Sequence, residues 1–191
     1  GGAWCADADR TLVAGVAAQA PPTARRTRAE KTITVDTLKL DGSTQNPVTH
    51  IAIANGVFSQ CNVRIQHGVD TDDSQEVSPF TTTWLGGDND LRTGPSCASV
   101  TAEERRMFEG GVSEYGLGGG RISAFFVESV SGFSASAYSC RGTAGVHRLL
   151  RNKAVVENSG STDTLAHELG HILINNARLD SHALPGVMHS R

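Results

Sequence analysis

Residues 161–175 read STDTLAHELGHILIN, and this stretch decides how the rest of the chain is interpreted. Its apolar residues recur at the spacing of one helix face, which predicts an amphipathic α-helix. The members of this stripe are Leu165, Leu169, Ile172, Leu173 and Ile174. The three residues before Thr164 are all good N-caps, so we expect the helix to begin there.

The helix contains His167-Glu168-Leu169-Gly170-His171, an HExxH motif. Because an α-helix turns about 100° per residue, the two histidines lie one above the other and Glu168 lies beside them. Two imidazoles so placed can bind one ion, and this geometry suits zinc. The alternative is a pair of exposed histidines on an amphipathic helix. The well-capped, rigid helix favours the metal site.

A catalytic zinc usually takes three protein ligands and keeps one position for water. No Glu follows Glu168, so the third ligand must be another residue type. We favour His182 as this ligand, with Asp180 as the alternative. Whichever of the two does not bind the metal could hydrogen-bond to the one that does and so orient it. His189 directly follows Met188 and ranks last. The upstream histidines are expected to be surface or core residues; these are His50, His67 and His147.

Upstream patterns place strands and helices before the motif. Alternating residues predict a strand from residue 31, a strand over 62–66, and a short strand over 153–157. A helix is favoured for 49–58, and a capping box predicts another from Thr101 to about Glu109, ended by Gly110-Gly111. The stretch 121–130 is typical of a central strand. Residues 68–98 and 131–145 are interpreted as loops.

Composition excludes several classes of partner. The chain has 191 residues and a formal net charge of -3, so we expect one domain and no binding to nucleic acid or to a membrane. No apolar run approaches the roughly 20 residues that span a bilayer. Residues 1–30 are interpreted as an extended N-terminal arm and 31–191 as the domain. We expect a monomer.

Four cysteines lie far apart in the sequence, with no CxxC pair; they are Cys5, Cys61, Cys97 and Cys140. An even number fits two disulfides in any of three pairings, which indicates an oxidising compartment and a secreted protein. One alternative is four reduced, buried thiols. Another is that the Cys5 thiolate caps a metal ion in a latent enzyme.

A second metal was considered at Asp88-Asn89-Asp90, between Gly87 and Gly94. Carboxylate and amide oxygens in so short a span are typical of calcium loops. The segment lacks the spacing of an EF-hand. We therefore favour an ordinary solvated turn over a calcium site.

The HExxH helix, a candidate ligand downstream and Val187-Met188 as a Met-turn together resemble the metzincin clan of zinc metallopeptidases. The resemblance loosely covers 31–191, and its specific part is the last 25 residues. It implies an α+β fold, with a small, twisted, mostly parallel sheet packed on the active-site helix and a minimal C-terminal part. The clan usually continues HExxHxxGxxH or HExxHxxGxxD. Here Ile174 and Ala177 occupy the Gly and ligand positions, so the third ligand is displaced.

By this resemblance the protein is expected to be a secreted zinc endopeptidase, a hydrolase that cleaves protein or peptide substrates. Zinc would lower the pKa of its bound water to about 7, and Glu168 would act as the general base. The substrate is expected to bind along the sheet edge as an added strand. The alternatives are a non-catalytic, zinc-stabilised secreted binding domain and a zinc hydrolase that acts on something other than peptide.

Overall fold

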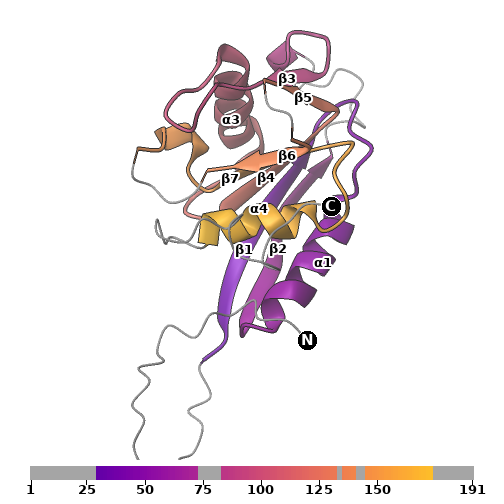
Figure 1. Cartoon of the computed structure of the whole chain (residues 1–191), viewed down its shortest axis with the longest axis vertical. Helices are drawn as coiled ribbons and strands as arrows, with labels where there is room; N and C mark the ends of the chain where they lie inside the picture. The colour runs from indigo at the N-terminus through magenta and orange to yellow at the C-terminus, as the bar shows by residue number, and fades with distance from the viewer. Residues whose placement is uncertain (1–28, 73–82, 133–134, 141–144, 174–191) are drawn as a thin grey trace, which may run out of the picture.

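A computed structural model describes residues 29–72, 83–132, 135–140 and 145–173, which form a mixed α/β fold (Figure 1). In chain order its elements are β1 (Lys31–Lys39), α1 (Pro47–Ser59), β2 (Val63–Asp72), β3 (Asp90–Arg92), α3 (Ala102–Tyr115), β4 (Ile122–Val127), β5 (Ser129–Ser131), β6 (Ala137–Ser139), the 3₁₀-helix η2 (Arg148–Leu150), β7 (Lys153–Glu157) and α4 (Thr164–Leu173). None of the described helices is long and apolar enough to cross a bilayer.

The main sheet has the strand order β2-β1-β4-β7-β6. Its first four strands are parallel, and β6 pairs antiparallel with β7. All six residues of β4 are buried, as expected for a central strand. The mostly parallel sheet that the resemblance implies is thus confirmed. A small second sheet pairs β3 with β5.

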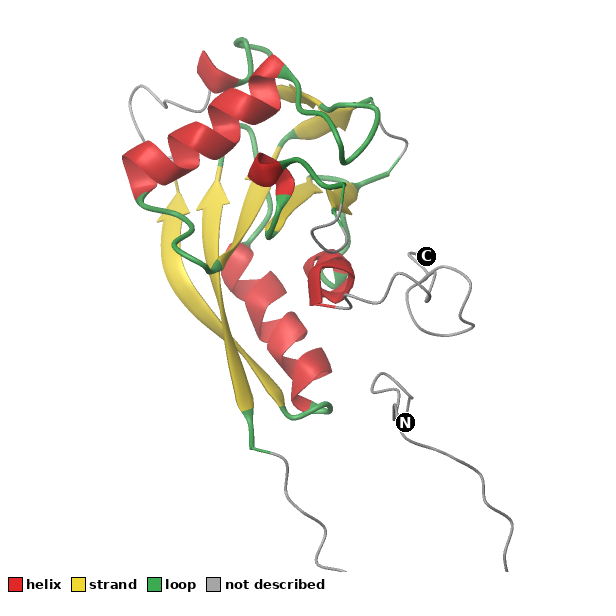
Figure 2. Ribbon diagram, turned by 90° about the vertical axis from the view of Figure 1, so that its left-hand side faces the viewer, coloured by secondary structure: helices red, strands yellow, loops and turns green. Residues whose placement is uncertain are grey.

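Helices cover both faces of the sheet (Figure 2). On one face, Ile51 of α1 and Leu165 and Leu169 of α4 pack into a single apolar cluster. On the other face, Met107 and Phe108 of α3 belong to a second cluster. Residues of β4 alternate between the clusters, because successive side chains of a strand point to opposite faces. This layering places α4 against the part of the sheet formed by β6 and β7.

Helix α3 begins as predicted but ends later. Its capping box is formed by Thr101 and Glu104. The expectation that Gly110-Gly111 ends the helix is wrong, since α3 continues to Tyr115. These glycines instead allow close packing: a Cβ on Gly110 would collide with the Trp84 ring, and one on Gly111 would lie 2.9 Å from Phe125. The helix ends where Gly116 adopts a left-handed conformation, with φ 66°.

Three other elements differ from the sequence interpretation. The strand predicted over 121–130 is divided, because Glu128 separates β4 from β5 in the second sheet. The region 68–98, interpreted as a loop, contains the end of β2 and all of β3. The region 131–145, also interpreted as a loop, contains β6. A three-residue strand has too little pattern to be recognised without its partner β7.

Candidate metal centre

Helix α4 carries the HExxH motif and begins at Thr164, as predicted. Its first turn is closed by hydrogen bonds from Thr164 N to Ser161 O and from His167 N to Asp163 O. Leu165 and Leu169 are fully buried and point into the core. His167 and His171 lie on a different side of the helix and are partly buried. The apolar stripe therefore fixes the orientation in which the imidazoles are presented.

The imidazoles of His167 and His171 converge. Their Nε2 atoms lie 3.1 Å apart, and their rings meet edge to face with centroids 4.7 Å apart. Two zinc–nitrogen bonds of about 2.0–2.1 Å at a tetrahedral angle would separate the nitrogens by about 3.4 Å. The observed separation is close to that value. Both histidines can therefore hold one zinc ion with little rearrangement.

Glu168 completes the cluster. Its carboxylate and the two imidazoles each offer a ligand atom, and these atoms all lie within 4.8 Å of one another. Within the described residues this is the one group of three or more acidic, histidine or cysteine side chains so arranged. Two neutral nitrogens beside a carboxylate are the donor chemistry that zinc sites use. The residues present thus fit the ion that the motif predicts.

The environment of the Glu168 carboxyl group changes its acidity. The residue is 5% exposed, and this burial raises its pKa to about 7, while a hydrogen bond from Ser139 opposes the rise. The Ser139 hydroxyl lies 2.7 Å from Oε2 of Glu168 and 3.0 Å from its backbone oxygen. A group with a pKa near neutrality can both accept and release a proton at physiological pH.

Ser139 was missed in the sequence. It comes from the edge strand β6, within the region interpreted as a loop. No motif marks a serine 29 residues before its partner. Only the pairing of β6 with β7 brings this hydroxyl to α4.

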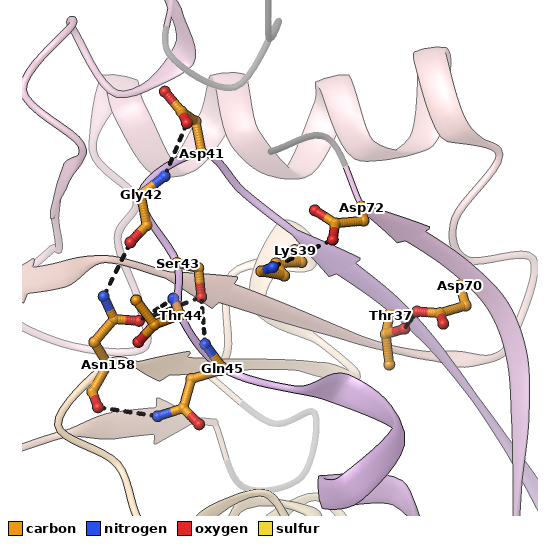
Figure 3. Close-up of polar contacts among 10 residues, drawn as sticks. All are labelled: Thr37, Lys39, Asp41, Gly42, Ser43, Thr44, Gln45, Asp70, Asp72 and Asn158. Carbon is orange, nitrogen blue, oxygen red and sulfur yellow. Dashed lines mark hydrogen bonds and ion pairs between the residues drawn. The ribbon is translucent and has the colours of Figure 1, made fainter. Parts of the chain in front are cut away.

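A set of hydrogen bonds, here named the latch, ties the loop before α1 to the turn before α4 (Figure 3). The Asn158 side chain accepts from Thr44 N at 2.7 Å and donates to Gly42 O at 3.0 Å. The Gln45 Nε2 atom lies 2.9–3.0 Å from three backbone oxygens; these belong to Glu157, Asn158 and Gly160. The latch therefore holds the turn from which α4 starts.

His50 extends the latch into the core. It is fully buried, and its Nε2 lies 2.8 Å from Oε1 of Gln45. Burial lowers the pKa of His50, an effect that the charge of Asp163 partly offsets. The neutral ring with a proton on Nε2 satisfies Gln45, while Nδ1 has no hydrogen-bond partner among the described residues.

The two other upstream histidines also lie away from the HExxH cluster. His67 Nε2 lies 2.7 Å from the Thr37 hydroxyl, which donates to Asp70. His147 Nδ1 accepts from Leu149 N at the start of η2. Both side chains therefore have local partners in the protein, as expected for surface or core histidines.

The loop considered for calcium is held by contacts within the protein. Asp88 forms an ion pair with Arg92 at 3.1 Å, Asn89 donates to Glu128 at 3.1 Å, and Asp90 accepts from Ser129 at 2.8 Å. The carboxylates of this segment do not gather into a ligand cluster within the described part of the chain. Each of these three side chains therefore has a partner within the protein.

Cys97 and Cys140 form a disulfide with a Cα–Cα distance of 5.8 Å. Cys61 is also disulfide-bonded, and none of the described cysteines is free. The alternative of four reduced thiols is therefore wrong.

Several predicted residues fall outside the described ranges. The candidate third ligands His182 and Asp180, together with Met188 of the Met-turn, belong to 174–191. Cys5 and most of the predicted N-terminal arm belong to 1–28. The roles assigned to these residues stay predictions.

No protein-family model matches the chain. No curated protein matches it either. Among solved structures, the chain is similar to the crystal structure of metalloproteinase-II from Bacteroides fragilis, with a TM-score of 0.44 and 12% sequence identity. The similarity covers 76% of this chain and 44% of that protein, so the chain spans less than half of its length.

Proposed function

We propose that the protein is a secreted, zinc-dependent endopeptidase of the metzincin type. One observation supports this most: the Nε2 atoms of His167 and His171 converge beside a buried carboxylate on the same helix. The disulfide between Cys97 and Cys140 supports an oxidising compartment.

In this proposal His167 and His171 hold the ion, and Glu168 moves protons. Zinc, when bound, acts as a Lewis acid and lowers the pKa of a coordinated water. Glu168 would accept a proton from the attacking water and deliver it to the leaving amine. The carboxyl group is thereby restored at the end of each cycle. Its raised pKa, about 7, suits a group that must gain and lose a proton.

The remaining ligand is proposed to be His182, with Asp180 as the alternative. Met188 is proposed to lie beneath the metal, by resemblance to the clan's Met-turn. Zinc binding by a His182→Ala variant compared with an Asp180→Asn variant distinguishes the two candidates.

The substrate is proposed to bind as an extended strand along β6. This strand ends the order of the main sheet, and its residue Ser139 contacts the HExxH helix. An extended peptide can add to such an edge through main-chain hydrogen bonds. That placement would bring the scissile bond near Glu168.

A purely structural zinc site is the competing function. Such a site closes all four positions with ligands. A buried carboxylate that lies beside the imidazoles and is held by Ser139 favours catalysis instead.

The test is cleavage of casein by the full chain after zinc loading. A chelator should abolish cleavage, and added zinc should restore it. Glu168→Gln should retain one zinc per chain and lose about 10²–10⁴-fold in kcat, the usual contribution of a general base. Glu114→Gln, at an exposed site on α3, is the matched control and should cleave like the unmodified protein. Undiminished cleavage by a zinc-loaded Glu168→Gln protein would contradict the proposal.

A further inference from the structure

We infer that Ser139 is a positioning residue that holds the Glu168 carboxylate for proton transfer. The inference rests on the proposed function and adds a residue that the HExxH motif does not contain. The Ser139 hydroxyl oxygen makes two contacts with Glu168. The Ser139 Oγ lies 2.7 Å from Glu168 Oε2 and 3.0 Å from the Glu168 backbone oxygen.

These two contacts constrain the whole Glu168 side chain. The Ser139 hydroxyl contacts the backbone end and the carboxylate end of the same residue, so rotation about the bonds between them would break at least one contact. A hydroxyl has one proton to donate, whereas a carbonyl oxygen and an ionised carboxylate oxygen only accept. Ser139 therefore shares its proton between the two Glu168 oxygens in a three-centre hydrogen bond. The conformation of Glu168 is held from outside its own helix.

The contact also distinguishes the two carboxylate oxygens. Oε2 is held by Ser139, whereas Oε1 has no hydrogen-bond partner within the part of the chain that the structure describes. One of the two carboxylate oxygens lies within 4.8 Å of a ring nitrogen of each histidine, so the carboxylate is near enough to exchange a proton with a water beside these histidines. Oε1 is the oxygen that Ser139 leaves available for this exchange. We assign this exchange to Oε1.

Three interactions of β6 and the residue after it restrict the movement of Ser139, so its hydroxyl can hold Glu168 in one position. Ser139 pairs with Ala154 of β7 in the main sheet. The preceding Tyr138 points to the opposite face, where its hydroxyl donates to the buried Glu104 at 2.8 Å. The following Cys140 is linked to Cys97. A functional group is oriented best by neighbours that are themselves locked.

The experiment compares Ser139→Ala with Ser139→Thr in the zinc-loaded full chain. Ser139→Ala should lower kcat about 10–100-fold and change KM less than about 2-fold. A loss of this size is usual for residues that hydrogen-bond to the groups around a metal without touching the metal themselves. Ser139→Thr keeps a hydroxyl on the same carbon and suits a strand, so kcat should return to within about 3-fold of the unmodified protein. Ser113→Ala, at an exposed site on α3, is the control and should change neither constant.

Two readouts are independent of activity. The zinc dissociation constant, measured by chelator competition, should change less than about 2-fold in Ser139→Ala, because the histidines are untouched. A crystal structure of Ser139→Ala should show the Glu168 carboxylate displaced from its position in the unmodified protein.

The outcomes separate this inference from the proposed function. An unmoved carboxylate in Ser139→Ala, or an unchanged kcat, overturns the positioning role. Loss of zinc by Ser139→Ala overturns it as well, since Ser139 would then act on the fold of the site. If the unmodified protein binds zinc but cleaves no peptide, the proposed function fails, and the position of the carboxylate still decides the role of Ser139.

Discussion

Glu168 is buried beside two imidazoles, and this location costs stability at neutral pH. Its pKa is raised from 4.5 to about 7 by burial. The folded state therefore binds the proton more tightly than the unfolded state, so stability falls as pH rises through the window from 4.5 to about 7. At about 1.4 kcal/mol per pKa unit, the full effect is roughly 3 kcal/mol. The carboxylate that we propose as the general base therefore lowers the stability of the metal-free protein at neutral pH.

Replacing this charge should stabilise the metal-free protein in a pH-dependent way. Glu168→Gln should raise the free energy of unfolding by about 1–3 kcal/mol at pH 8 and by much less at pH 5, because the unmodified residue is then protonated. Urea titration of the metal-free protein at both pH values measures the difference. The exposed Glu114→Gln variant should show no such pH dependence. A gain of equal size at both pH values would contradict the burial argument.

At the scale of elements, the latch fixes the position of the turn that precedes α4. Gln45 and Asn158 belong to two connections that are more than 100 residues apart, yet each side chain bonds to the backbone of the other connection. Since the two loops follow β1 and β7, the latch joins the ends of two parallel strands of the main sheet. The HExxH helix is therefore placed by contacts outside its own sequence.

Removing the Gln45 side chain should loosen α4. Gln45→Ala would leave backbone oxygens of the turn and the buried His50 Nε2 without their partner, a cost of about 1–3 kcal/mol. Hydrogen exchange should become faster at the first amides of α4 and unchanged in α3. Gln60→Ala, at an exposed glutamine after α1, is the matched control and should leave exchange unaltered. Unchanged protection of α4 in Gln45→Ala would show that the latch does not hold the helix.

Some elements were predictable from the sequence and others were not. The start of α4 and the capping box of α3 depend on a few consecutive residues, and both predictions are confirmed. The end of α3 was mispredicted because Gly110 and Gly111 are explained by Trp84 and Phe125, which contact them from other parts of the chain. Strand β6 was missed because it exists through its pairing with β7.

For the whole molecule, zinc should act as a stabilising ligand. An ion that binds only the folded chain adds about 2.7 kcal/mol at a free concentration 100 times its dissociation constant. For a domain of this size that corresponds to a rise in Tm of roughly 5–10 °C. Thermal unfolding of the protein with and without zinc measures this rise in Tm. His167→Ala should abolish the rise and His147→Ala, away from the cluster, should retain it; an equal rise in both variants would place the zinc elsewhere.

The arrangement of the three HExxH side chains, which carry the proposed chemistry, follows from the sequence. Helical periodicity alone places His167 above His171 with Glu168 beside them, because all three belong to consecutive turns of one helix. The acidity and the conformation of Glu168, in contrast, depend on the folded chain. Its burial, its raised pKa and its contact with Ser139 come from the packing of α4 against β6 and the core. Desolvation and hydrogen bonding depend on neighbours in space, which no local pattern specifies.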